Sequence, residues 1–312
     1  SETALKACLT SRHPRESYVL TNKLSGWHFE KEEEIRPLFQ SQLEACGVEY
    51  FDFYLMHAQS QNNYDKYIQC RAYEIAQELK AEGKVRHVGL SFHDSAEFLD
   101  KILTEHPEVE VVQIQFNYAD MENPQVQSRA CLEVCRKHNK PVIVMEPVKG
   151  GRLVNLPVAA RQILEELEGG SVASYAIRFA AGFEGMMMVL SGMGDLDMVQ
   201  DNCGYMVDFQ PLSETERAAV EKVAAILADK ELIACTGCRY CTEKCPQTLD
   251  IPWLVERYNE RLFSGGKAVW TLPERAEGKD PAACIGCQNC ESVCPQNIRI
   301  SDMMRDFAAN LE

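Results

Sequence analysis

Eight of the fourteen cysteines fall into two runs that share one spacing, Cys-x-x-Cys-x-x-Cys-x-x-x-Cys-Pro, at residues 235–246 and 284–295. Three thiolates at such short intervals let one loop wrap three corners of a cubic [4Fe–4S] cluster, while the fourth cysteine of each run ligates the other cluster. The spacing therefore predicts two clusters. Their ligand sets are Cys235, Cys238, Cys241 and Cys294 for one, and Cys284, Cys287, Cys290 and Cys245 for the other.

Glycine and proline accompany both runs at matching positions. Gly237 and Gly286 stand between the first two ligands, where a residue without Cβ accepts unusual dihedral angles and lets backbone amides approach the sulfurs. Zinc is the alternative, because Cys-x-x-Cys pairs also suit a tetrahedral ion, but zinc has no use for the third and fourth cysteine at this spacing. The other cysteines have no ligand spacing and are interpreted as packing residues: Cys8, Cys46, Cys70, Cys131, Cys135 and Cys203.

Ahead of the cysteine runs, apolar segments alternate with amphipathic ones. Strands are predicted at 18–22, 50–56, 85–90, 109–116, 141–146 and 186–190. Helices are predicted at 31–46, 64–81, 95–104, 125–138 and 157–181, the last broken at Gly169-Gly170. Because each return to the same sheet edge needs a crossover, this alternation favours parallel strands and the α/β class.

The predicted architecture is a TIM-type (β/α)8 barrel followed by a small α-helical and loop domain that binds the clusters. The barrel spans residues 1–232 and the cluster domain residues 233–312. Only six strands are visible, so the first two are expected to precede Ser1, which is not a methionine. An open doubly wound sheet is the alternative, although no Gly-x-Gly-x-x-Gly turn follows any predicted strand.

Composition excludes several classes of partner. The 32 Lys and Arg against 47 Asp and Glu give a net charge of −15, which repels nucleic acid and anionic membranes. No apolar stretch approaches the roughly 20 residues that span a bilayer, and no secretion signal opens the chain. A cytoplasmic location is therefore expected, and cysteines kept reduced there favour metal binding over disulfides.

Two charged or titratable side chains stand at the ends of the first two predicted strands. Lys23 follows the apolar segment 18–22, and His57 follows the segment 50–56. Because the carboxyl ends of barrel strands form the catalytic face, a cation and a titratable ring are expected to converge there. Lys23 and His57 are therefore the candidate catalytic residues.

At this point the sequence resembles the aldo-keto reductase superfamily, in its branch with a C-terminal ferredoxin domain. The matching segments are VRHVGLSFH at 85–93, QIQFNY at 113–118, MEPVKGG at 145–151 and LSGM at 190–193. The resemblance implies hydride transfer from NAD(P)H to an aldehyde or ketone by an Asp, Tyr, Lys and His tetrad. Lys23 would lower the pKa of the tyrosine and His57 would orient the carbonyl oxygen. The aspartate and tyrosine are expected before Ser1.

The same resemblance implies two groups of nicotinamide-binding residues. Ser91, Gln113 and Asn117 would lie near the carboxamide, whereas the residues near the adenine half would be Gly192, Met193, Asp201 and Asn202. Residues 192–198 carry two acids and no base, which disfavours a 2′-phosphate, so NAD is predicted over NADP.

Electron counting separates the possible functions. Nicotinamide gives up two electrons together, clusters exchange them singly, and no flavin motif is visible to split the pair. The leading interpretation is an NAD(P)H-linked carbonyl reductase whose clusters are structural or linked to a redox protein partner. One alternative is an enzyme that feeds single electrons to a substrate at the barrel mouth without nicotinamide. Another is a non-enzymatic ferredoxin-like carrier.

Overall fold

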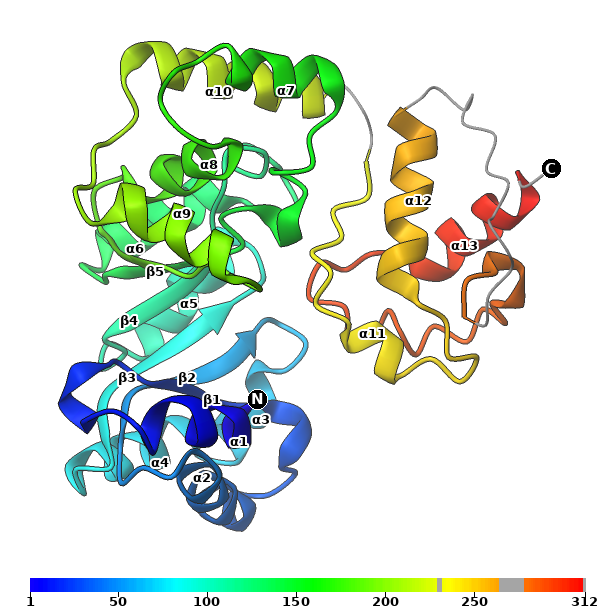
Figure 1. The fold of residues 1–312 in the computed structure, drawn as a ribbon. Coiled ribbons are helices and arrows are strands. Elements are labelled where there is room, and N and C mark those ends of the chain that lie inside the picture. The colour runs from blue at the N-terminus through cyan, green and yellow to red at the C-terminus, as the bar shows by residue number, and fades with distance from the viewer. Residues whose placement is uncertain (229–231, 264–277, 311–312) are drawn as a thin grey trace. The chain divides into compact units, whose positions relative to one another are not determined.

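The computed structural model describes residues 1–228, 232–263 and 278–310. Within these residues, six parallel strands form one sheet in which each strand pairs with the next along the chain (Figure 1). The strands are β1 (Thr21–Leu24), β2 (Phe51–Gln59), β3 (Val85–Phe92), β4 (Val111–Gln115), β5 (Val142–Met145) and β6 (Met186–Val189). This sequential order confirms the α/β, TIM-type arrangement. The doubly wound alternative is wrong, because that fold reverses its strand order at a switch point.

Helices occupy the crossovers between the strands and most of the C-terminal third. In the first part of the chain they are α1 (Glu2–Leu5), α2 (Glu32–Cys46), α3 (Tyr64–Gln69), α4 (Ala72–Ala81), α5 (Ala96–Glu105) and α6 (Ser128–Lys137). The remaining helices are α7 (Val158–Glu165), α8 (Val172–Ala181), α9 (Leu196–Met206), α10 (Glu214–Ala228), α11 (Tyr240–Glu243), α12 (Ile251–Phe263) and α13 (Ile300–Ala309). No helix in the described part of the chain is both long and apolar enough to span a membrane.

The first strand starts later than the apolar pattern predicts, at Thr21 instead of residue 18. The reason is Asp52, a buried carboxylate that accepts a hydrogen bond from the Leu20 amide at 2.8 Å and pairs with Arg15 at 2.7 Å. A side chain therefore satisfies the Leu20 backbone donor that a strand partner would otherwise bind. As a result Lys23 lies within β1, one residue before its end.

Two of the predicted helices are each divided. The segment 64–81 forms α3 and α4, because Arg71 adopts a left-handed conformation with φ of 52° between them. The segment 157–181 forms α7 and α8 around Gly169-Gly170, as predicted, and Ser171 then caps α8 by accepting from the Ser174 amide. A left-handed residue interrupts the helical hydrogen-bond ladder, and only glycine adopts that conformation without cost.

Side chains from four of the six strands pack together on one face of the sheet. Leu55, Val111 and Ile143 form a buried cluster, against which Phe53 and Met188 pack. These residues come from β2, β4, β5 and β6, and layered packing of strand side chains of this kind is typical of a barrel interior. Apolar side chains therefore fill the inner face of the sheet, which is a packed core and not a pore.

Contact clustering divides the chain into two compact units. Unit 1 comprises residues 1–116, 120–145 and 184–189, and it holds the whole sheet. Unit 2 comprises residues 117–119, 146–183 and 190–312, and it holds α7 to α13 with both cysteine runs. The predicted division at residues 232 and 233 stays a prediction.

The two cysteine runs have similar backbone conformations. Left-handed residues occur at three matching positions in or just after each run, in the pairs Gly237 and Gly286, Arg239 and Gln288, and Thr248 and Asn297. The runs differ in that Tyr240–Glu243 of the first forms α11, whereas residues 289–293 of the second form a turn. Apolar side chains of α12 and α13 form a separate core, in which Leu254, Met304 and Phe307 are fully buried. Equal spacing in the sequence thus gives two similar loops that pack on one core.

Candidate functional site

Two hollows in unit 2 are each lined by four cysteines. The first hollow takes three ligands from the first run and one from the second: Cys235, Cys238, Cys241 and Cys294. The second hollow has the reverse composition: Cys284, Cys287, Cys290 and Cys245. Each measures about 340 Å³ including the open space at its mouth. These are the two ligand sets that the spacing predicts, with the fourth cysteines exchanged between the runs.

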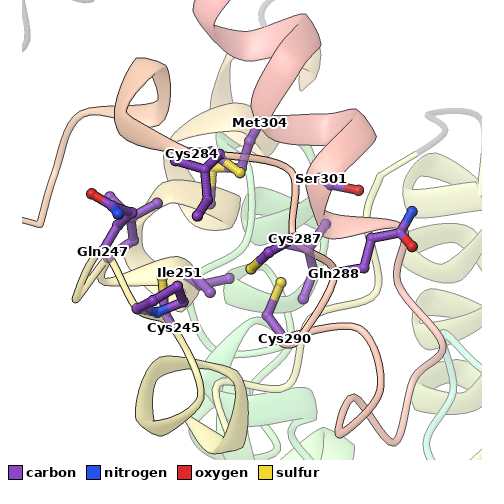
Figure 2. Close-up of a pocket in the computed structure, with 13 residues that line it drawn as sticks. Cys245, Gln247, Ile251, Cys284, Cys287, Gln288, Cys290, Ser301 and Met304 are labelled. Carbon is purple, nitrogen blue, oxygen red and sulfur yellow. The ribbon is translucent and has the colours of Figure 1, made fainter.

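The remainder of each lining is largely apolar. Figure 2 shows the four cysteines of the second hollow together with Ile251 and Met304, which also line it. In the first hollow, the Gly237 amide donates to the sulfur of Cys235 at 3.4 Å, which is the approach that a glycine at this position predicts. An apolar shell with backbone amides directed at thiolates is the environment in which iron–sulfur clusters are held.

The separation of the cysteines bears on the zinc alternative. Across residues 1–228, 232–263 and 278–310, no three His, Cys, Asp or Glu side chains converge closely enough to hold a single metal ion. A mononuclear zinc site needs four thiolates about 2.3 Å from one centre, whereas a cubane places its ligands around a larger body. Four cysteines line each hollow, three of them from one loop, and this is the donor set of a [4Fe–4S] cluster.

Burial raises the pKa of several of these thiols. It brings the pKa of Cys241 to about 12 and that of Cys290 to about 11, in each case with neighbouring cysteines adding to the shift. Iron binds the thiolate, so loading of the hollows releases protons. Of the six other cysteines, four are buried as packing residues, whereas Cys8 and Cys203 are exposed.

In unit 1, Lys23 lies close enough to His57 for its charge to lower the pKa of the imidazole. Burial and then the charge of Lys23 lower the pKa of His57 to about 3, while burial lowers the pKa of Lys23 to about 8. Near neutral pH the imidazole is therefore neutral, and the ammonium is still mostly charged. A neutral donor beside a cation that titrates near the working pH suits proton and charge transfer at a substrate oxygen.

His57 lies at an irregularity in β2. The pairing of β2 with β3 shifts between Met56 and Gln59, and Ala58 is left-handed with φ of 51°. Ser91 fixes this β-bulge, because its hydroxyl accepts from the Ala58 amide at 2.8 Å. The sequence pattern predicts His57 at the end of its strand. In the structure β2 continues to Gln59, and His57 lies beside a bulge that redirects its side chain.

Several residues around His57 are missed by reasoning from the sequence. The Ser25 hydroxyl lies 2.6 Å from His57 Nδ1, and the Trp27 ring packs 4.9 Å from the imidazole. The Tyr67 hydroxyl lies 2.7 Å from the Leu24 carbonyl oxygen and 3.1 Å from that of His57, and so joins the ends of β1 and β2.

His93 is a further missed neighbour, and its charge contributes to the lowered pKa of His57. Burial and Lys23 bring the pKa of His93 itself to about 4. The one signal in the sequence is its position just beyond β3, at the same end of the sheet as the two predicted residues.

The residues predicted to bind the nicotinamide carboxamide are buried. Ser91 holds the bulge, and the Gln113 amide nitrogen lies 3.1 Å from the sulfur of Met145, while its buried carbonyl oxygen has no hydrogen-bond partner among the described residues. That oxygen could accept from a ligand amide. Asn117 donates to the Glu146 carbonyl at 3.0 Å and accepts from the Ala119 amide, which gives it a structural task.

The residues predicted near the adenine half are in unit 2. Asp201 accepts from the Ser171 hydroxyl at 2.6 Å, and Asn202 donates to Ser191 at 3.1 Å. Gly192 and Met193 are exposed. Ser91 and Gln113 belong to unit 1, whereas Asn117 and these four belong to unit 2, so their assembly into one site stays a prediction.

Comparison with protein families gives two matches in series. The profile described as the Aldo/keto reductase family matches residues 1–225, and the profile of the 4Fe-4S dicluster domain matches residues 234–298. A curated relative, the NADH-specific methylglyoxal reductase of Escherichia coli (strain K12), is 28% identical over 123 residues. That match covers 39% of this chain and 35% of the relative, so the chain spans about a third of the length of the curated relative it matches.

Solved structures resemble the chain in fold. The thermostable aldo-keto reductase Tm1743 with the inhibitor epalrestat has a TM-score of 0.59 at 17% identity, and covers 71% of this chain and 77% of that one. An aldo-keto reductase from Klebsiella pneumoniae in complex with NADPH has a TM-score of 0.57 at 20% identity. The match covers 72% of this chain and 75% of that one. At these identities the likeness shows a common fold.

Proposed function

The chain belongs to the aldo/keto reductase family, and from this premise we propose that it reduces an aldehyde or ketone with NAD(P)H, using Lys23 and His57 at the carbonyl oxygen. Family and dicluster domain make it an oxidoreductase with an iron–sulfur domain. The carbonyl class is supported by the methylglyoxal reductase among its relatives, and a nicotinamide cofactor is supported by that NADH-specific enzyme and by the NADPH complex.

The observation that carries this proposal is the buried, neutral His57 beside the charge of Lys23. With its pKa near 3, His57 stays neutral, and in the tautomer where Ser25 donates to Nδ1, the proton resides on Nε2. Nε2–H can then donate to the carbonyl oxygen of a substrate. The Lys23 ammonium stabilises the negative charge that develops on this oxygen as hydride reaches the carbon.

Bound NAD(P)H would supply the hydride. The residues of unit 1 that could position its carboxamide are Gln113, through its unpartnered carbonyl oxygen, and Ser91, whose hydroxyl hydrogen is not used in its contact with Ala58. Both are buried, so a ligand amide that reached them would displace little water. The two acids between residues 192 and 198 support NAD over NADP.

The clusters belong to the same proposal. We assign Cys235, Cys238, Cys241 and Cys294 to one cluster and Cys245, Cys284, Cys287 and Cys290 to the other, since these sets line the two hollows. Their role in the reductase is structural or an electron connection to a redox protein partner. About eight irons per chain are expected in protein purified without oxygen.

The test is anaerobic oxidation of NADH and of NADPH by the full-length chain with methylglyoxal as the carbonyl probe. We expect turnover with NADH that falls sharply in His57→Ala and less in His57→Gln, because glutamine retains a neutral N–H donor. Absence of nicotinamide binding by calorimetry would contradict the proposal.

A second function is favoured by one specific observation, the contact in unit 2 between the loop after β5 and the start of the first cysteine run. That contact would let single electrons pass, without nicotinamide, between a cluster and a compound bound at that loop. In this case the visible absorption of the reduced clusters would recover on addition of a substrate, with neither NADH nor NADPH present.

A further inference from the structure

The loop that follows β5, here called the β5 loop (residues 146–152), lies against the first cysteine run. Gly150 is left-handed with φ of 61°, and a Cβ at this position would collide with the Thr236 carbonyl. Thr236 is buried and stands between the ligands Cys235 and Cys238. The backbone of the β5 loop therefore touches the peptide that wraps the first hollow, and only glycine permits this approach.

Arg152 makes the second contact between the same two segments. Its Nη1 donates to the carbonyl of Ile233, two residues before the ligand Cys235. Asn259 of α12 fixes that residue from the other side, donating to the Ile233 carbonyl at 2.9 Å and accepting from its amide at 2.7 Å. The Ile233 backbone is therefore fixed by Asn259, and it fixes the Arg152 guanidinium next to the first cysteine run in turn.

The two hollows differ in the charged side chains around them. Arg239 lines the first hollow, and Arg152 is bound two residues before its ligand Cys235. Among the described residues, no charged side chain lines the second hollow.

We propose that Arg152 is a positioning residue that makes the cluster of the first hollow easier to reduce than the cluster of the second. Reduction adds one negative charge, and a fixed cation at the hollow edge stabilises the reduced form. An electron shared between the clusters then resides mainly on the one that touches the β5 loop. This inference rests on the cluster assignment in the proposed function.

The experiment is a redox titration of the anaerobic, iron-loaded full-length chain, followed by electron paramagnetic resonance. Two reduction steps are expected, and Arg152→Gln should reduce the equilibrium constant for the higher-potential step about three- to tenfold while leaving the other step in place. Arg152→Lys, which keeps the charge, should restore most of the difference. Arg161→Gln is the matched control, since it removes the same charge from an exposed ion pair with Glu165 on α7.

The step that moves is assigned to a hollow by serine substitution of the exposed ligand in each. Cys238→Ser should alter the spectrum of the step that responds to Arg152, and Cys287→Ser the spectrum of the step that does not. Equal shifts of both steps, no shift, or a response confined to the cluster altered by Cys287→Ser would each overturn the proposal.

A second pair of variants tests the contact independently of charge. Gly150→Ala should shift the same step, because it displaces the β5 loop from Thr236. Gly151→Ala is the control, because Gly151 is also left-handed, with φ of 89°, but its nearest neighbour would be Asn155 at 3.9 Å. Equal effects of the two variants would contradict the role of the contact.

The iron content is read before any titration. Wild-type protein that contains two zincs and no iron would contradict the cluster assignment itself. Two clusters whose reduction steps do not change in the Arg152 variants would contradict only this inference.

Discussion

In the cysteine region, three of the four ligands of each hollow lie within one short segment, 235–241 or 284–290. At the barrel mouth, by contrast, Lys23, His57 and His93 come from the ends of three successive strands far apart in the sequence. The first site is encoded by local spacing and repeats itself, and the second exists only because parallel strands end at a common edge. A mutation of one cysteine should therefore abolish most of one cluster and leave the other in place. A mutation at the barrel mouth should lower activity by an amount that depends on the residue.

The largest effect is expected from substitution of Cys245 or Cys294, because each is proposed to ligate the cluster that the other run mainly holds. Cys294→Ala should remove or degrade the cluster otherwise held by the first run, and lower the iron content from about eight to about four per chain. The remaining resonance spectrum should equal that of Cys238→Ala, because both variants damage the first hollow. If it instead equals that of Cys287→Ala, each run binds its own cluster and the exchange is wrong.

The second-largest effect is expected from substitution of Lys23. Lys23→Met removes the cation that stabilises charge on the substrate oxygen, and kcat for methylglyoxal reduction should fall about 100-fold or more. Lys137→Met is the matched control, because this exposed lysine pairs with Asp100 away from the strand ends. Iron content should be unchanged in both variants. A loss of iron in Lys23→Met would show that the two regions are not independent.

The pH dependence sharpens the same contrast. Because the pKa of Lys23 is lowered to about 8, the charged form needed at the oxygen disappears as pH rises through about 8, and kcat should decline there. Lys23→Met should lack this decline in its residual activity. Rates measured from pH 6 to pH 10 at saturating NADH check the prediction, and a decline that persists in the variant assigns the titration to another group.

His57 is expected to affect stability at acid pH. Its folded pKa of about 3 lies below the ordinary value of 6.5, so the unfolded chain binds more protons between these values. This contribution to stability is therefore fully present above about 6.5 and is lost as pH falls toward about 3. Urea unfolding of His57→Gln should show a flatter dependence in that window than the wild type. Parallel curves would contradict the buried, neutral state of His57.

The smallest effect is expected at the bulge. Ser91→Ala leaves the Ala58 amide without its acceptor, which should cost about 1–3 kcal/mol of unfolding free energy. The KM for the carbonyl substrate should rise with little change in iron content, since the bulge positions His57. Ser41→Ala, on the exposed face of α2, is the control for loss of a surface hydroxyl. Equal destabilisation of both variants would leave Ser91 without a positioning role.

Much of the fold follows from the alternation of apolar and amphipathic segments, because a parallel sheet imposes that alternation on any sequence that forms it. The departures occur where side chains override the backbone pattern. Asp52 delays the start of β1, Arg71 divides the helix predicted at 64–81, and the Ala58 bulge shifts His57 within its strand. Each of these depends on a hydrogen bond or a backbone angle that hydrophobic periodicity does not encode.

The sequence by itself predicted two sets of four cysteines, down to the exchange of Cys245 and Cys294, and the two hollows gather the same sets. This was possible because ligand spacing along one loop is a local property of the chain. The sequence also predicted that Lys23 and His57 converge at the carboxyl ends of the strands. Only the tertiary structure decided that burial keeps His57 neutral and lowers the pKa of Lys23 to about 8, and that Arg152 of the β5 loop binds the Ile233 carbonyl next to the first cysteine run. Burial and charge are sums over neighbours distant in sequence, so they exist only once the chain has folded.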